Sequence, residues 1–137
     1  MSPSWTCPRC DRRFGRANRA HVCEPGLPVE VWLETLPEPQ RRAAVKVLAI
    51  VRRYAGVIVE AVSIGVLVKR ERTLVELRPK QRWLQLSFVS AATVVSPRIS
   101  RAIQVSDRTA YFVRVADDTA IDAELRRWLA DALRSRR

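Results

Sequence analysis

The sequence predicts an α+β fold, in which helices cover one face of an antiparallel sheet and a small separate module precedes them. Residues 28–54 and 117–134 repeat apolar side chains at the spacing of amphipathic helices. Segments between residues 57 and 115 are rich in valine and isoleucine or alternate apolar with polar side chains, which is typical of strands. Short polar connections between these segments favour hairpins and therefore antiparallel pairing.

A cluster of structure-breaking residues, Glu24-Pro25-Gly26-Leu27-Pro28, sets the predicted domain boundary. It divides the chain into a module over 1–24, a linker over 25–28 and an α+β domain over 29–137. A chain of 137 residues allows one ordinary domain with a small appendage and excludes a multidomain enzyme.

Two helices are predicted before the sheet. Pro28 suits the first turn of a short helix with Val31, Trp32 and Leu36 toward the core, and Pro37 ends it. Pro39 starts a second helix, and Gly56 is a natural stop for it. The apolar stripe of the second helix consists of Ala44, Val47, Leu48, Val51 and Tyr54.

A third helix is predicted after the sheet, over Asp117–Arg134. Thr119 and Asp122 have the spacing of a capping box, and arginines crowd the C-terminal end, where the helix dipole is negative. The apolar stripe of this helix consists of Ile121, Leu125, Trp128, Leu129 and Ala132.

The strand segments predict an antiparallel meander. They are Val57–Val62, Ile64–Lys69, Thr73–Arg78, Arg82–Val89 and Ala110–Val115. Alternation assigns the faces, because neighbouring side chains of a strand point to opposite sides. It places Leu84, Leu86 and Phe88 on one face, with Trp83, Gln85 and Ser87 on the other. By the same rule, Val75 and Leu77 point away from Glu76 and Arg78.

Composition excludes several classes of protein. A hydrophobic content of 47% and a charged content of 28% are globular values, which argue against wholesale disorder. The longest weakly polar run, Tyr54 to Val68, is interrupted by Glu60 and is too short for a membrane span. Residues 1–20 are polar and rich in arginine, with no apolar stretch of a secretory signal, so we expect a cytoplasmic protein.

The chain is strongly basic. It has 25 Lys and Arg against 14 Asp and Glu, a formal net charge of +11, and a sequence pI of about 11.1. Such an excess favours binding to a polyanion. Arginine outnumbers lysine heavily, so compositional drift is an alternative explanation for part of the charge.

All three cysteines and the single histidine lie within seventeen residues, at Cys7, Cys10, His21 and Cys23. Disulfides explain this cluster poorly, because three cysteines leave one unpaired and a cytosolic chain is kept reduced. Three thiolates and one imidazole complete a tetrahedral zinc site. We therefore expect one structural Zn²⁺, and no catalytic role for it, because all four positions are filled by protein.

The ligand spacing predicts a knuckle-like CCHC module. Cys7 and Cys10 form a C-x2-C turn, whereas His21 and Cys23 are separated by one residue, which suits an extended or turn conformation better than a helix. Five arginines surround these ligands and are candidates for phosphate contacts, although a solvated surface explains them equally simply. They are Arg9, Arg12, Arg13, Arg16 and Arg19.

A second basic cluster lies in the predicted sheet. Over residues 69–82 there are six basic and two acidic residues, and Trp83 follows directly. The candidate nucleic-acid or anion-binding residues here are Lys69, Arg70, Arg72, Arg78, Lys80, Arg82 and Trp83. Arginine forks suit phosphate or carboxylate, and a tryptophan stacks on a base. The alternative is an edge charged to keep the protein soluble, with Trp83 packed under arginine stems.

Catalysis has little support in the sequence. With His21 and all three cysteines assigned to zinc, no histidine or thiol remains for a dyad or triad. The four glycines form no phosphate-cradling loop. We expect a protein that is not an enzyme.

Residues in both parts of the chain carry a likeness to a known family. In the module they are Trp5, Cys7, Pro8, Cys10, Arg12, Phe14, Asn18, His21 and Cys23. In the body they are Val62-Ser63-Ile64-Gly65, Lys69-Arg70, Arg72-Thr73, Glu76-Leu77-Arg78-Pro79-Lys80, Trp83, Ser96-Pro97-Arg98-Ile99 and Ile121-Asp122. Together they resemble an uncharacterised bacterial domain, domain of unknown function 5655, and the zinc segment that precedes it. Asp11 and Arg19 depart from the family pattern. The resemblance implies a small helix–sheet–helix domain and no established activity.

Three functions from different classes fit these observations. The first is a zinc-stabilised accessory protein that binds RNA, DNA or a ribonucleoprotein through its arginines. The second is an adaptor whose zinc module docks an acidic protein. The third is a domain that binds a small anionic ligand or a metal ion on the sheet face of Lys69, Arg78 and Trp83. The sequence does not fix the oligomeric state.

Overall fold

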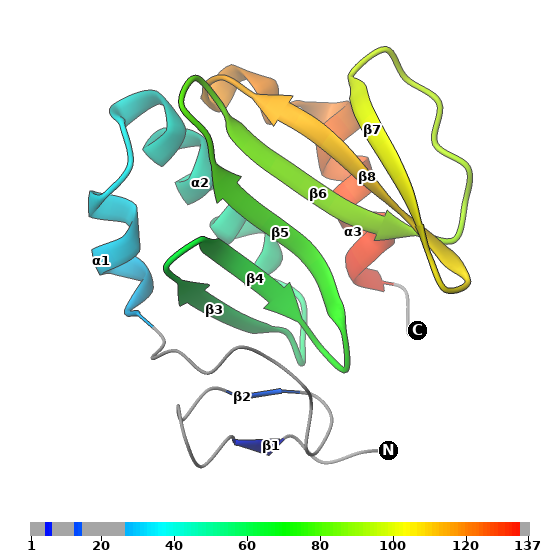
Figure 1. The fold of residues 1–137 in the computed structure, drawn as a ribbon, viewed down its shortest axis with the longest axis horizontal. Coiled ribbons are helices and arrows are strands. Elements are labelled where there is room, and N and C mark those ends of the chain that lie inside the picture. The colour runs from blue at the N-terminus through cyan, green and yellow to red at the C-terminus, as the bar shows by residue number, and fades with distance from the viewer. Residues whose placement is uncertain (1–4, 7–12, 15–26, 135–137) are drawn as a thin grey trace.

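The structure is a computed structural model that describes residues 5–6, 13–14 and 27–134 of the chain. Figure 1 shows a broad antiparallel sheet with helices α2 and α3 behind it. The predicted α+β class is confirmed. Of the predicted module over 1–24, the described residues are two short paired strands, β1 (Trp5–Thr6) and β2 (Arg13–Phe14).

The body consists of a helical start, a six-stranded sheet and a helical end. The helices are α1 (Val29–Glu34), α2 (Glu38–Val51), the 3-10 turn η1 (Asp118–Ala120) and α3 (Ala123–Arg134). The strands are β3 (Ile58–Val62), β4 (Gly65–Lys69), β5 (Thr73–Pro79), β6 (Leu84–Ser90), β7 (Ile99–Val105) and β8 (Arg108–Val115).

The strand order in the sheet is β3-β4-β5-β6-β8-β7, with every neighbouring pair antiparallel. The predicted meander is therefore correct from β3 to β6. Strand β7 was not predicted. It follows β6 in the chain but lies at the edge of the sheet, and β8 occupies the position between β6 and β7. Most of the side chains of β7, among them Arg101 and Gln104, are exposed, so the strand carries no apolar alternation that would reveal it.

Alternation places the hydrophobic core on the face covered by the helices. Leu84, Leu86 and Phe88 of β6 are at most 1% exposed, as predicted, and they pack with buried residues of α2 and α3. The same face of β5 and β8 contributes buried side chains, among them Leu77 and Val113. Burial of this kind is the main favourable term in folding, at about 25 cal/mol per Å² of apolar surface.

Helix α1 anchors the start of the domain through Trp32, which is 2% exposed, and contacts α2 and β3. Leu36 is also buried, as predicted. Val31 is 47% exposed, so its predicted place toward the core is wrong. In α2, Pro39 lies in the first turn and the predicted stripe is buried through Val51, with Tyr54 partly buried against it.

Helix α3 begins later than the sequence predicts, at Ala123. Asp117 instead caps the turn η1, and hydrogen bonds from Thr119 to its carboxylate lower the pKa of Asp117. Asp122 Oδ1 accepts a hydrogen bond from the backbone N–H of Leu125 at 3.1 Å. The predicted capping box, with Thr119 as the cap, is therefore wrong, because Asp122 is the residue that caps α3.

Among the described residues, no helix is both long and apolar enough to cross a lipid bilayer.

Candidate functional site

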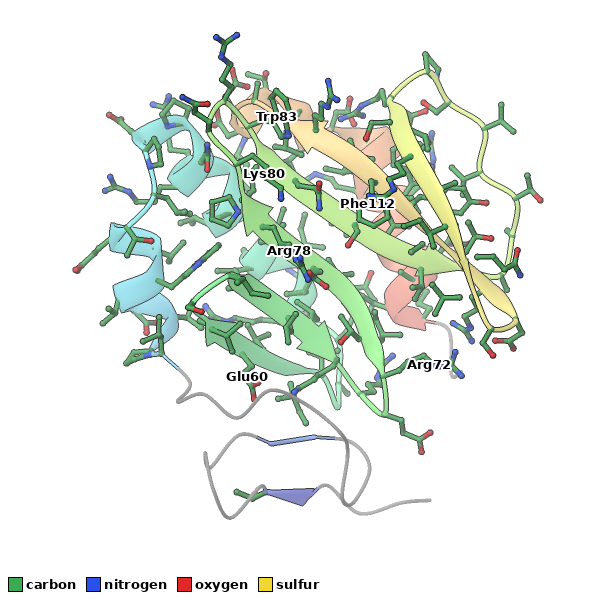
Figure 2. The ribbon with its side chains drawn as sticks, viewed as in Figure 1. Glu60, Arg72, Arg78, Lys80, Trp83 and Phe112 are labelled. Atoms are coloured by element: carbon green, nitrogen blue, oxygen red, sulfur yellow. The ribbon has the colours of Figure 1, made fainter. Side chains whose placement is uncertain are left out.

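The sheet surface opposite α2 and α3, which we call the open face, carries a shallow groove. Two adjoining hollows form it, with volumes of about 570 Å³ and 390 Å³. Lys80, Gln85, Arg101 and Phe112 line both hollows, so the groove is continuous across β5, β6, β8 and β7. Figure 2 shows Lys80, Trp83, Phe112 and Arg78 gathered on this face.

The strand register explains why these side chains meet. Gln85 stands opposite both Arg78 of β5 and Arg114 of β8. Phe112 stands opposite Ser87 on one side and Arg101 of β7 on the other. Side chains that are opposite in antiparallel strands lie on the same face, and these positions alternate with core positions. The hydrophobic pattern that fills the core therefore also assembles the open face.

The larger hollow is strongly basic. Its lining contains four cations and no carboxylate: Lys80, Arg82, Arg101 and Arg114. Among the residues that the structure describes, no carboxylate forms an ion pair with any of these four side chains, whereas Arg78 pairs with Glu76 at the edge of the smaller hollow. The four side chains therefore form a cluster of positive charge on the open face.

Two aromatic rings lie in the same hollow, each under an arginine. The guanidinium of Arg114 lies 4.4 Å from the ring centroid of Trp83, and that of Arg101 lies 5.6 Å from the ring centroid of Phe112. Cation–π contacts of this geometry hold the guanidinium over the ring while its N–H groups remain directed outward. Each ring is thus covered on one face by a guanidinium, and for Trp83 this is the packing under an arginine that the sequence offered as the alternative to binding.

The structure brings together four of the predicted binding residues and places three elsewhere. Arg78, Lys80, Arg82 and Trp83 line the groove. Lys69, Arg70 and Arg72 line neither hollow.

Each of these three cations has its own protein contact. Lys69 is buried, and its Nζ lies 3.3 Å from Glu60 Oε1. Arg70 donates hydrogen bonds to backbone carbonyl oxygens of Ala55 and Leu133. Arg72 pairs with Asp107 at 3.6 Å, and Figure 2 shows it at the turn between β4 and β5, away from Lys80 and Trp83.

Three residues of the groove were missed by sequence reasoning: Arg101, Phe112 and Arg114. Phe112 and Arg114 alternate with the buried Tyr111 and Val113 in a strand that the sequence did predict, so alternation alone puts them opposite the core. Arg101 lies in the strand that was not predicted, and nothing in its local sequence points to the groove.

The predicted zinc ligands lie outside the described residues: Cys7, Cys10, His21 and Cys23. So do Arg9, Arg12, Arg16 and Arg19, whereas the backbone of Arg13 belongs to β2. In the part of the chain that the structure describes, no three His, Cys, Asp or Glu side chains gather as metal ligands would.

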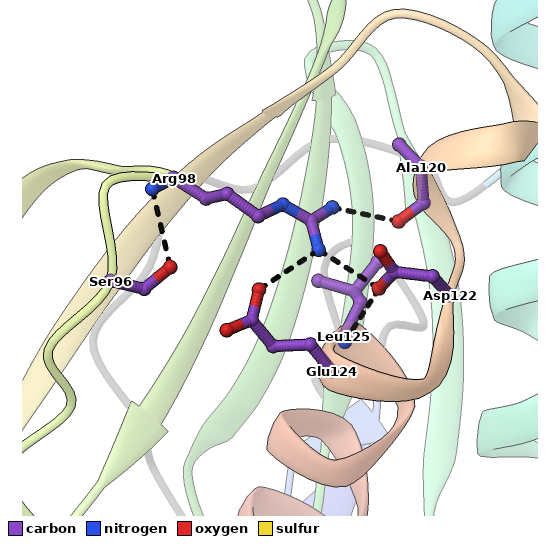
Figure 3. Close-up of polar contacts among 6 residues, drawn as sticks. All are labelled: Ser96, Arg98, Ala120, Asp122, Glu124 and Leu125. Carbon is purple, nitrogen blue, oxygen red and sulfur yellow. Dashed lines mark hydrogen bonds and ion pairs between the residues drawn. The ribbon is translucent and has the colours of Figure 1, made fainter.

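A separate polar cluster joins the connection before β7 to the start of α3 (Figure 3). The guanidinium of Arg98 donates to Asp122 Oδ1 at 2.9 Å, to Glu124 Oε1 at 3.3 Å and to the carbonyl oxygen of Ala120 at 2.7 Å. It also lies 5.6 Å from the ring centroid of Trp128. Because both terminal nitrogens of the Arg98 guanidinium donate to acceptors within the protein, we interpret this cluster as structural.

The Arg98 cluster gives a stability prediction. Arg98→Met is expected to lower the free energy of unfolding by about 1–2 kcal/mol, because two carboxylates and a carbonyl oxygen lose a charged donor. The control is Arg127→Met, which removes an exposed arginine of α3. Thermal unfolding at pH 7 measures the difference, and equal melting temperatures for the two variants would contradict the assignment.

The same cluster predicts a dependence on pH. The backbone hydrogen bond from Leu125 and the side chain of Arg98 lower the pKa of Asp122 in the folded protein. A carboxyl group with a lowered pKa contributes stability above its unfolded pKa of about 4, and this contribution is lost as the pH falls through the lower folded value. The difference in melting temperature between wild type and Arg98→Met is therefore expected to narrow as the pH falls below about 4, while the part due to the Ala120 carbonyl remains.

Comparisons with known proteins found no match to this chain. No protein-family model matches it. A search of curated proteins found no similar chain, and a search of solved structures found no similar fold. The resemblance to domain of unknown function 5655 therefore stays a prediction from the residues that carry it.

Proposed function

We propose that this chain is a non-enzymatic accessory protein that binds nucleic acid, free or within a ribonucleoprotein, through the open face of its sheet. The observation that carries the proposal is the larger hollow, whose lining holds four cations, two aromatic rings and no carboxylate. Phosphate groups are the natural partners of such a surface, since arginine and lysine supply most protein contacts to the nucleic-acid backbone.

The grouping of the basic side chains supports this function over a merely solvated surface. Elsewhere in the described chain, some basic side chains such as Lys46, Lys69 and Arg98 are paired with carboxylates. The four cations of the larger hollow have no carboxylate partner among the described residues, and they lie close enough together to line one cavity. Like charges gathered without counter-charges destabilise the folded state, so their grouping favours a ligand that compensates them.

The N-terminal module belongs to the same proposal. One zinc ion held by Cys7, Cys10, His21 and Cys23 would stabilise a segment too small to bury a core of its own. Its arginines would add phosphate contacts to those of the open face. The sequence alone supports this part.

The function is tested by removing the four cations of the hollow. We expect Lys80→Gln/Arg82→Gln/Arg101→Gln/Arg114→Gln to bind a fluorescein-labelled RNA at least about tenfold more weakly than wild type at 100 mM salt, because four phosphate contacts are lost. The slope of log affinity against log salt should fall by about one for each cation removed. Fluorescence anisotropy across a salt titration measures both quantities.

The matched control removes the same charge from the helical side of the protein. Arg52, Arg53, Arg126 and Arg127 are exposed on α3 and at the end of α2, opposite the open face. Changing all four to Gln is expected to leave the salt slope nearly unchanged. The proposal fails if wild type binds neither RNA nor duplex DNA at low salt, or if both quadruple variants lose affinity equally.

A further inference from the structure

We propose that the ligand of the open face is a single-stranded nucleic acid, with two of its bases stacked on Trp83 and Phe112. This inference rests on the proposed function, and it adds the form of the nucleic acid and the residues that select it. The juxtaposition that carries it is that of two rings and four cations in one hollow, where none of the cations has a carboxylate partner among the described residues.

The described aromatic side chains form two groups, one in or against the hydrophobic core and one on the open face. Five of the aromatic side chains that the structure describes belong to the hydrophobic core or pack against it: Trp32, Tyr54, Phe88, Tyr111 and Trp128. Trp83 and Phe112 do neither, and both line the larger hollow, partly exposed. Two partly exposed rings that line one hollow among polar side chains form a surface that a partner can cover.

The arginines over the two rings are exchangeable partners. A guanidinium and a nucleobase both make a flat contact with an aromatic face, so a base can take the place of Arg114 over Trp83 and of Arg101 over Phe112. Both arginines are exposed and come from strands at the side of the rings. Once displaced, each guanidinium stays beside its ring, where the phosphate of the stacked nucleotide would lie.

The position of the rings on the sheet surface disfavours a duplex as the ligand. Trp83, in the turn before β6, and Phe112 of β8 both line the shallow groove and are partly exposed. In a duplex the bases are stacked on one another and only their edges reach the grooves, so the faces of the bases are closed to these rings. A single strand, with its bases free to turn outward, can contact rings and cations together.

The open face also discriminates against an acidic protein as partner. Aspartate and glutamate side chains would compensate the four cations but have no flat group for the two rings. A ligand in which every repeating unit has both a negative charge and a flat aromatic group contacts the cations and the rings together. Single-stranded RNA and DNA both have this chemistry, and the 2′-hydroxyl distinguishes them.

The test compares ligands with equal numbers of phosphates. The probes are labelled twelve-nucleotide oligoadenylate and oligothymidylate, a duplex with twelve phosphates in all, and polyglutamate as a polyanion without bases. We expect wild type to bind the better of the two single strands at least about tenfold more tightly than the duplex or polyglutamate. Binding of the single strand should also quench the fluorescence of Trp83.

Conservative variants separate the contribution of the two rings to binding from that of the four cations. Trp83→Leu and Phe112→Leu keep an apolar side chain and are each expected to weaken single-strand binding about tenfold while the salt slope is unchanged. Quenching should disappear in Trp83→Leu. Trp128→Leu, whose ring packs against Phe88 on the core face, is the matched control and should retain affinity when its circular dichroism is native.

The outcomes separate this inference from the proposed function. If the duplex binds as tightly as either single strand, or if both folded ring variants keep full affinity, the stacking inference is overturned while the proposed function stands. If no nucleic acid binds at low salt, both fail. If polyglutamate binds best, the open face is a site for an acidic protein and both are overturned.

Discussion

Gly65→Ala is expected to abolish the folded sheet. A Cβ at this position would lie 2.0 Å from the carbonyl oxygen of Leu77 and 3.2 Å from the Cα of Arg78, with the backbone φ at +156°. The obstacle is the backbone of β5, an inner strand whose own pairings on both sides prevent it from moving away. We expect a cost of more than about 4 kcal/mol, a large part of the usual stability of a domain.

The control for this prediction is Gly56→Ala. Gly56 also has a positive φ, +79°, but an added Cβ there would meet the side chain of Arg70 no closer than 3.8 Å. The expected cost is about 1 kcal/mol, from the left-handed backbone alone. Circular dichroism and urea unfolding compare the two variants. A Gly65→Ala protein that melts within a few degrees of Gly56→Ala would show that β4 and β5 do not approach so closely.

Cys10→Ser is expected to remove zinc from the protein. Elemental analysis of wild type purified without added metal should give about one zinc per chain, because four protein ligands hold structural zinc tightly. Serine in place of Cys10 leaves three ligands, and we expect the zinc content to fall close to zero. Residues 1–24 should then become sensitive to protease, while the sheet domain, whose core lies in residues 32–133, keeps its melting transition.

Asp11→Ser is the matched control, since it changes the neighbouring residue and no ligand. It should keep its zinc. Wild-type protein that is free of metal yet resists protease over residues 1–24 would refute the zinc site, as would a Cys10→Ser variant with undiminished zinc.

The sequence predicts those parts of the fold in which burial leaves a pattern. Leu84, Leu86 and Phe88 alternate with Trp83 and Gln85 because one face of β6 is covered by helices and the other is not. Strand β7 at the edge has weak contact with the core on either face, so its side chains are not constrained to alternate. Its existence follows from pairing with β8, which local sequence does not encode.

The candidate site, too, could be predicted only in part from the sequence. Arg78, Lys80 and Trp83 were found because one hairpin carries them all. Arg101 and Arg114 reach the groove from later strands, and their approach to Phe112 and Trp83 depends on a register that forms only in the folded sheet. Lys69 is the opposite case: it is close in sequence to the groove residues, but it pairs with Glu60 of the neighbouring strand and does not line the groove.

The strand order also has a consequence for the order of folding events. Every pairing in the six-stranded sheet joins consecutive strands except that of β6 with β8. Hairpins form quickly, whereas this pairing requires closure of a longer loop that contains β7. We therefore expect it to be the late step. Because Gln85 meets Arg114 across that junction, a chain halted before the late step has hairpins but no groove. Newly made copies would then acquire affinity for the proposed ligand only when folding is complete.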